Sequence, residues 1–170
     1  MSSILKVDQI QLSNGNTPTA GDLGLDIDGN ILQVVQHAST AAVSSTTAGW
    51  VNGGFNQTIT PSSASSKILV LYNIWCIVYG SGGSHIAWDL VRTVNGVTSG
   101  RFANTQYGFS ALYSIGTSSH QGTAVMQYLD SPNTTSAVTY TPQFNSVNNQ
   151  QANFGNGARK GTITLLEIAG

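Results

Sequence analysis

The stretch Lys67–Tyr79, KILVLYNIWCIVY, decides the fold of this chain. It is the longest apolar run, it contains neither Gly nor Pro, and it is rich in the β-branched and aromatic residues that favour strands. Alternate side chains of a strand point to opposite faces of its sheet. One face would carry Ile68, Val70, Tyr72, Ile74, Cys76 and Val78. The other face would carry Leu69, Leu71, Asn73, Trp75, Ile77 and Tyr79.

Both faces of this strand are mainly apolar, so both are predicted to be buried. An antiparallel sheet commonly leaves one face in water. The chain has only one evident core, and we therefore expect further copies of the protein to cover the second face. The predicted trimer interface consists of Leu69, Leu71, Trp75, Ile77 and Tyr79. A buried helix remains the alternative, because a short apolar run does not settle its own period. Pro61 before the run and Gly80 after it favour the strand.

The composition points to a protein that works within an assembly. Hydrophobic residues make up 40% of the 170 positions, and charged residues only 8%, against about 25% in typical soluble domains. Six basic and seven acidic residues give a net charge of −1, and no basic stretch could follow a phosphate backbone, so nucleic acid is not expected as a partner. No apolar run is long enough to cross a bilayer as a helix, so membrane insertion is not expected.

Short strands separated by turn residues predict an all-β fold, an antiparallel β-sandwich of jelly-roll type. The pair Asn95-Gly96 predicts a hairpin between 86–94 and 97–102. The segments 109–115 and 123–129 could pair as a second hairpin. Pro142 indicates that 137–144 forms an edge strand or contains a bulge. The remaining predicted strands are 31–37, a bent segment at 50–60, and 162–169.

The first 31 residues are predicted to form an extended arm, and residues 32–170 a β-sandwich knob. The arm is too poor in apolar residues to fold alone, so we expect it to lie against a partner or a sister subunit. Its segment 7–12 could form a short strand. Turns are expected at Asn14-Gly15 and at Asp28-Gly29-Asn30.

Motifs of catalysis are absent: there is no G-x-S-x-G, P-loop, G-x-G-x-x-G, H-E-x-x-H or C-x-x-C. We therefore predict no enzyme activity and no cofactor or metal. Asp26-Ile27-Asp28-Gly29-Asn30 resembles the opening of a calcium loop, but the later bidentate Glu is missing, which favours a plain turn. Cys76, the only cysteine, is expected to be a buried hydrophobe. In a trimer a histidine near the axis could bind a metal ion, with ordinary hydrogen-bonded side chains as the alternative: His37, His85 and His120.

Five aromatic residues fall in or beside predicted loops, and each has two interpretations. Exposed rings near Asn and Gln are typical of sugar-binding surfaces, whereas buried rings would fill the core or a seam between subunits. The sequence favours the core or seam, and it identifies no receptor-binding residue. The five are Trp50, Trp88, Tyr107, Phe109 and Tyr113.

Several phrases resemble small virion proteins of phages, especially those of cyanobacteria and other aquatic bacteria. They are the opening SSILKVDQIQ…NTPTAGDLGLDIDGNIL with LQVVQ, then ITPSSASSKILVLYNI, DSPNTTSAVTYTPQF and TITLLEIAG. Such proteins are tail fibres or other virion structural components. The resemblance implies an N-terminal attachment segment and a trimeric knob. The apolar residues that would attach the arm to other virion proteins are Ile4, Leu5, Val7, Ile10, Leu12, Leu23 and Leu25.

The resulting hypothesis is a short tail fibre or fibre-like knob, located on the virion, that adheres to the host surface, with a glycan as a candidate partner. Two alternatives remain open at this point. One is a capsid or tail decoration protein with a purely stabilising role. The other is a free carbohydrate-binding module of lectin type.

Overall fold

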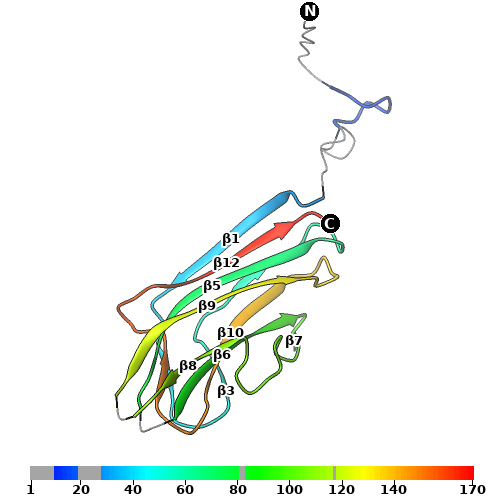
Figure 1. Cartoon of the computed structure of the whole chain (residues 1–170). Coiled ribbons are helices and arrows are strands. Elements are labelled where there is room, and N and C mark those ends of the chain that lie inside the picture. Colours follow the sequence, from blue (N-terminus) through cyan, green and yellow to red (C-terminus); the bar gives the residue numbers. More distant parts are fainter. Residues whose placement is uncertain (1–9, 19–27, 81–82, 117) are drawn as a thin grey trace, which may run out of the picture.

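The computed structural model describes residues 10–18, 28–80, 83–116 and 118–170. Within these ranges twelve strands form two antiparallel sheets that pack face to face (Figure 1). The prediction of an all-β, jelly-roll-like sandwich is confirmed. The first sheet contains β1 (Ile31–Ser39), β2 (Val43–Ser45), β5 (Lys67–Val78), β9 (His120–Asp130), β11 (Ala152–Phe154) and β12 (Gly161–Ile168). The second contains β3 (Trp50–Asn52), β4 (Gln57–Ile59), β6 (Ser84–Val94), β7 (Val97–Thr98), β8 (Ser110–Ser114) and β10 (Val138–Ser146).

Strand β5 is the centre of the first sheet, as its sequence predicted. It pairs with β9 along one edge and with β12 and then β11 along the other. The alternate side chains from Ile68 to Val78 that form one face of β5 are each at most 2% exposed, and they form much of the core between the sheets. The inner sides of β6, β10 and β12 supply much of the remainder, including Leu90, Tyr140 and Leu165, and β4, β9 and β11 add further residues.

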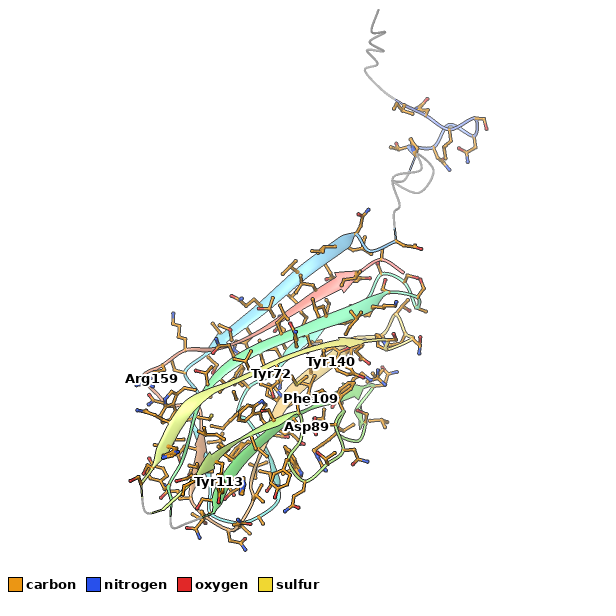
Figure 2. All side chains as sticks on the ribbon, in the orientation of Figure 1. Tyr72, Asp89, Phe109, Tyr113, Tyr140 and Arg159 are labelled. Carbon is orange, nitrogen blue, oxygen red and sulfur yellow. The ribbon has the colours of Figure 1, made fainter. Side chains whose placement is uncertain are left out.

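The strands run between two ends of the sandwich, called here proximal and distal. At the proximal end the chain enters β1 and leaves β12, where Ala169 N–H donates to the Asn30 carbonyl over 2.8 Å. Strands β6 and β9 begin at the opposite, distal end, where Ser84 pairs with Ser114 and Val78 with His120. Figure 2 shows Tyr113 at this distal end, far from the C-terminus marked in Figure 1.

The Asn95-Gly96 hairpin is confirmed. Both residues have positive φ, 49° and 79°, which is the conformation that lets a two-residue turn match the twist of its strands. The returning strand β7 is shorter than predicted. After Thr98 the chain follows β6 with isolated hydrogen bonds, such as Phe102 N–H to the Leu90 carbonyl at 3.1 Å.

The predicted hairpin between 109–115 and 123–129 is wrong. Strand β8 pairs with β6 in the second sheet, and β9 pairs with β5 in the first. Alternation shows that each strand has an apolar face to cover, but it does not say whether two consecutive strands share a sheet or face each other.

Pro142 does not mark an edge strand, because β10 lies between β6 on one side and β3 and β4 on the other. The alternative, a bulge within 137–144, is also not seen, because β10 pairs with β6 in continuous register from Val138 to Ser146. The Pro142 carbonyl accepts a hydrogen bond from Gly53 N–H (2.8 Å), so the side that lacks an N–H faces the bend between β3 and β4. The ladder of β10 with β3 and β4 is interrupted at this bend, so the missing N–H of Pro142 costs no regular hydrogen bond.

Cys76 lies fully buried on the inner face of β5. Burial raises the pKa of its thiol from 9.0 to about 11. A shift of about two units lowers the thiolate fraction roughly 100-fold, and the thiolate is the reactive form. We expect a thiol reagent at pH 8 to label the denatured protein and to leave the native protein unmodified over hours. Rapid labelling of the native protein would contradict this burial.

Candidate interaction surfaces

The outer face of the first sheet carries a row of apolar side chains at its proximal half. Leu69 on β5 lies opposite Leu166 on β12 and Leu129 on β9, and Leu166 lies opposite Val34 on β1. Val34 is 57% and Leu129 49% exposed, while the two central leucines are partly buried. Directly opposed side chains lie about 5 Å apart in antiparallel sheets. The four residues therefore form one continuous strip, called here the apolar row.

The remaining predicted interface residues extend along β5 toward the distal end. Leu71, Trp75 and Ile77 are partly buried, and Tyr79 just beyond the strand is 37% exposed. Asn73 interrupts them and is exposed. The Arg159 guanidinium lies 5.1 Å from the centre of the Trp75 ring, so the loop before β12 covers part of this face.

All five predicted interface residues thus lie on one outer face. Sequence reasoning missed Val34, Leu129 and Leu166, which belong to other strands. Their own strands show exposed or half-exposed apolar positions, but only the pairing register places them beside Leu69. That another copy covers this face stays a prediction.

The predicted attachment residues lie mostly outside the described residues: Ile4, Leu5, Val7, Leu23 and Leu25. Of the other two, Ile10 is 48% exposed and Leu12 is partly buried. The expected turn at Asn14-Gly15 is present, with Gly15 N–H donating to the Leu12 carbonyl over 2.9 Å. The part of the predicted short strand that is described, 10–12, is not a strand.

The segment compared with a calcium loop is described only from Asp28 onward, where it forms the expected turn with Gly29 at φ 90°. Gly29 N–H donates to the Ala169 carbonyl over 2.8 Å, which ties the turn to the chain after β12. Across the described ranges there is no group of three or more His, Cys, Asp or Glu side chains that could hold a metal ion. This turn therefore joins the arm to the sandwich.

The three histidines have separate environments within one subunit. The Nδ1 atom of His37 lies 2.7 Å from the Asn56 carbonyl, and that of His120 lies 3.1 Å from the Tyr113 carbonyl. The ring of His85 lies 4.3 Å from that of Tyr113, centre to centre. A metal site on a symmetry axis would need further copies and stays a prediction.

Of the five aromatic residues singled out in the sequence, two pack within the sandwich or along its open side. Trp88 is 7% exposed in the core, where its Nε1–H donates to the Val125 carbonyl over 3.3 Å. Phe109 lies 5.6 Å from Tyr128, centre to centre, between the edges of the two sheets. The core interpretation holds for Trp88, whereas Phe109 remains 37% exposed in the single subunit.

The other three lie on the second sheet's outer side or at its distal end. Trp50 is covered by the Arg101 guanidinium at 4.5 Å. Tyr107 and Tyr113 are 46% and 45% exposed, and both pack against His85. The sequence flagged these rings individually, but it gave no sign that they meet at one histidine.

One ion pair links the two sheets, and a second ties the loop after β7 to β6. Asp130 accepts two hydrogen bonds from Arg92 Nη1, at 2.9 and 2.8 Å, and one from the Tyr140 hydroxyl at 2.6 Å. Burial, and next the bond to Asp130, raise the pKa of Tyr140 far above its ordinary value, so this phenol stays protonated. Asp89 is fully buried and lies 3.6 Å from Arg101.

Glu167 is the polar exception in the predicted strand 162–169, and it is fully buried. Its carboxylate accepts hydrogen bonds from Ser62 N–H and Ser62 Oγ, both at 2.6 Å, and from Gln33 Nε2 at 2.5 Å. Burial by itself would raise the pKa of Glu167, but the hydrogen bonds outweigh burial and lower the pKa from 4.5 to about 2. The ionised carboxylate therefore ties β1, β12 and the 60–66 loop together.

A hollow of about 450 Å³ lies beside this carboxylate at the proximal end. It is lined by Asp28, Leu32, Ser62, Ser63, Ser65, Ser66, Ala169 and Gly170. The Ser62 hydroxyl donates to Glu167 and the Ser65 hydroxyl to the Gly170 carbonyl. No histidine is among the residues that line the hollow.

These features define a jelly-roll-like β-sandwich with one open apolar face and one aromatic end. No family model and no curated protein matches the chain. Among solved structures the chain is similar to the infectious bursal disease virus VP2 subviral particle, with 11% identity and a TM-score of 0.40 over 82% of this chain and 38% of that one. It is also similar to the structure of the Gx strain of that virus, with 10% identity and a TM-score of 0.42 over 82% and 39%.

The chain spans about two fifths of the length of these viral proteins. With TM-scores below 0.5, these likenesses assign neither a function nor a partner. The described residues include no helix long and apolar enough to cross a membrane.

Proposed function

We propose that this chain is a phage virion structural protein, a short tail fibre or fibre-like knob. It forms homotrimers through the outer face of the first sheet, attaches to the particle through residues 1–31, and presents the distal end of the sandwich to the host surface. The single observation that carries this proposal is the apolar row on an otherwise folded, well-packed sandwich.

The apolar row favours self-association because exposed, contiguous apolar surface is uncommon on monomeric proteins and marks interaction sites. Val34 and Leu129 would each lose about half of their side-chain area to a partner. The partly buried leucines between them would complete a dry strip. Identical subunits usually close such contacts by rotational symmetry, and the resemblance to fibre-like virion proteins supports three copies.

The positions of the proximal and distal ends support a distal end that faces away from the particle. The arm joins the sandwich at the proximal end, where Gly29 and Asn30 bond to Ala169. Tyr113 lies at the opposite end (Figure 2). A protein anchored through its arm would direct the distal end away from the particle.

A chain lacking residues 1–27 is expected to remain folded and to self-associate, because the turn at Asp28 and the whole of β1 are retained. It is expected not to join the particle when it is produced with the other virion proteins. Sedimentation and particle composition measure the two results. A full-length variant with Ile4, Leu5, Val7, Ile10 and Leu12 changed to Ser is the matched control and should behave like the deletion. An unfolded deletion product, or one that joins the particle normally, would contradict a separate anchor.

A purely stabilising decoration protein is the second candidate, favoured by the same apolar row if a capsid or tail protein rather than a sister subunit covers it. Labelling of host cells with the fluorescent purified protein separates the two functions. An adhesion protein binds the cells, and a decoration protein does not.

A further inference from the structure

We propose that the distal end of the sandwich binds a neutral saccharide through a tyrosine site formed by Tyr107, Tyr113 and His85. This inference rests on the proposed adhesion function and names the chemical class of its receptor. The site includes none of the residues that the structure leaves undescribed.

The three rings of the tyrosine site come from three different segments. His85 is on β6, Tyr113 on β8, and Tyr107 on the loop between β7 and β8. The His85 ring lies 4.3 Å from the Tyr113 ring at an interplanar angle of 32°, and 5.3 Å from the Tyr107 ring at 53°. Both tyrosines keep close to half of their surface exposed. The histidine therefore contacts both tyrosine rings, and each tyrosine still has surface that a ligand could cover.

The backbone around Tyr107 holds its ring in place before any ligand arrives. Gly108 has φ 58° and lies so close to β6 that a Cβ atom there would collide with the Trp88 carbonyl and the Trp50 ring. The Gln106 carbonyl accepts a hydrogen bond from Asn145 Nδ2 at 3.4 Å. A site that is ordered in advance loses less entropy on binding.

The other two segments are also held by side-chain hydrogen bonds. Asn148 Nδ2 donates to the Gly83 carbonyl, two residues before His85. The Nδ1 atom of His120 lies 3.1 Å from the Tyr113 carbonyl. The tyrosine site thus joins both sheets and the 147–150 loop at one end of the molecule.

The chemistry around the rings selects an uncharged, hydroxyl-rich ligand. The segments 83–88, 104–116 and 145–156 contain no Asp, Glu, Lys or Arg. A charged ligand would therefore find no permanently charged partner in these segments, where His85 is the only basic side chain. Just before Tyr107 the same segments also carry two exposed amides, Asn104 and Gln106, that can pair with hydroxyl groups. Tyrosine offers a flat apolar face and a polar hydroxyl at little entropic cost. A pyranose ring has the matching C–H face and hydroxyl rim.

The proposal is tested with the full-length purified protein on an array of neutral and acidic glycans, followed by titration of the methyl glycosides of the sugars that bind. We expect binding of neutral glycans only. Tyr107→Ala and Tyr113→Ala are each expected to weaken binding about tenfold, because each loses one stacked ring. Tyr113→Phe keeps the ring and should bind within about threefold of the wild type. Val97→Ala, an exposed change on β7, is the matched control and should bind normally.

Circular dichroism and sedimentation confirm that each variant is folded and assembled. A wild-type protein that labels host cells but binds no neutral glycan would overturn the saccharide site and leave the adhesion function intact. Tyrosine variants that bind glycan as well as the wild type would also overturn the site. Glycan binding that depends on Tyr113, without any labelling of host cells, would support the site and contradict the adhesion function.

Discussion

Leu69→Asp is expected to convert the proposed trimer into folded monomers. Leu69 lies at the centre of the apolar row, between Leu166 and Leu129. Covering such a side chain contributes about 2 kcal/mol per copy, and a carboxylate in its place would have to be dehydrated as well. Since a closed trimer repeats the change three times, the association constant should fall by roughly 10⁴-fold or more. Analytical ultracentrifugation across a range of concentrations measures the shift.

Val97→Asp is the matched control for this change. Val97 is 73% exposed on β7 of the second sheet, so the same charge is added away from the apolar row. It should leave the trimer intact. Both variants should keep the wild-type circular dichroism spectrum, because neither residue belongs to the core. A Leu69→Asp protein that still sediments as a trimer would move the subunit interface to another surface, and a wild-type protein that is monomeric would remove it altogether.

Glu167→Gln is expected to lower the free energy of unfolding at pH 7 by up to about 3 kcal/mol. The pKa of Glu167 in the folded protein, about 2, lies below its ordinary value of 4.5. A depressed pKa means that the ionised form stabilises the fold. Its contribution is complete above about pH 5 and is lost as the pH falls through 4.5 toward 2. A glutamine keeps the shape, but its NH₂ group turns a donor toward the Ser62 or Gln33 donors.

Urea denaturation from pH 2 to pH 8 measures this contribution. The wild type should lose stability steeply below pH 4.5, and the Glu167→Gln protein should start lower and show a flatter acid limb. Asp28→Asn removes an exposed carboxylate at the same proximal end and serves as the control. If wild type and Glu167→Gln have the same acid limb, another carboxyl governs acid unfolding.

Much of the fold could be predicted because its signals are local. Thirteen residues from Lys67 to Tyr79 alternate between two apolar faces, and this period identifies a central strand without reference to the rest of the chain. The Asn95-Gly96 turn depends only on two residues that tolerate positive φ.

The wrong predictions concern which strands pair with each other, not where the strands are. The strands β8 and β9 were recognised but paired with each other, because their sequences are equally compatible with β6 and β5. Pro142 predicted an edge strand or a bulge, although β10 is a regular inner strand and the side of Pro142 without an N–H faces the bend between β3 and β4. Each outcome depends on which segment lies opposite, and the residues of one strand carry little information about that.

The candidate surfaces, too, were predicted within one strand but not between strands. Alternation placed Leu69 and Trp75 on one face from the sequence alone. The sequence could not add Val34 or Leu129, since their alignment depends on the register of four strands. The meeting of Tyr107, Tyr113 and His85 depends further on a loop that returns along β6.

What the sequence determined by itself is therefore the local conformation: strands from a period of two, turns from Gly, Asn and Pro, and a core that 40% hydrophobic residues can supply. Only the tertiary structure decided which strands share a sheet, which apolar side chains form a continuous row, and which aromatic rings gather at the distal end. The physical reason is that side-chain direction follows from the chain's own dihedral angles. Register and layer, in contrast, are set by long-range pairing, where many arrangements satisfy the same alternation until the whole core is packed.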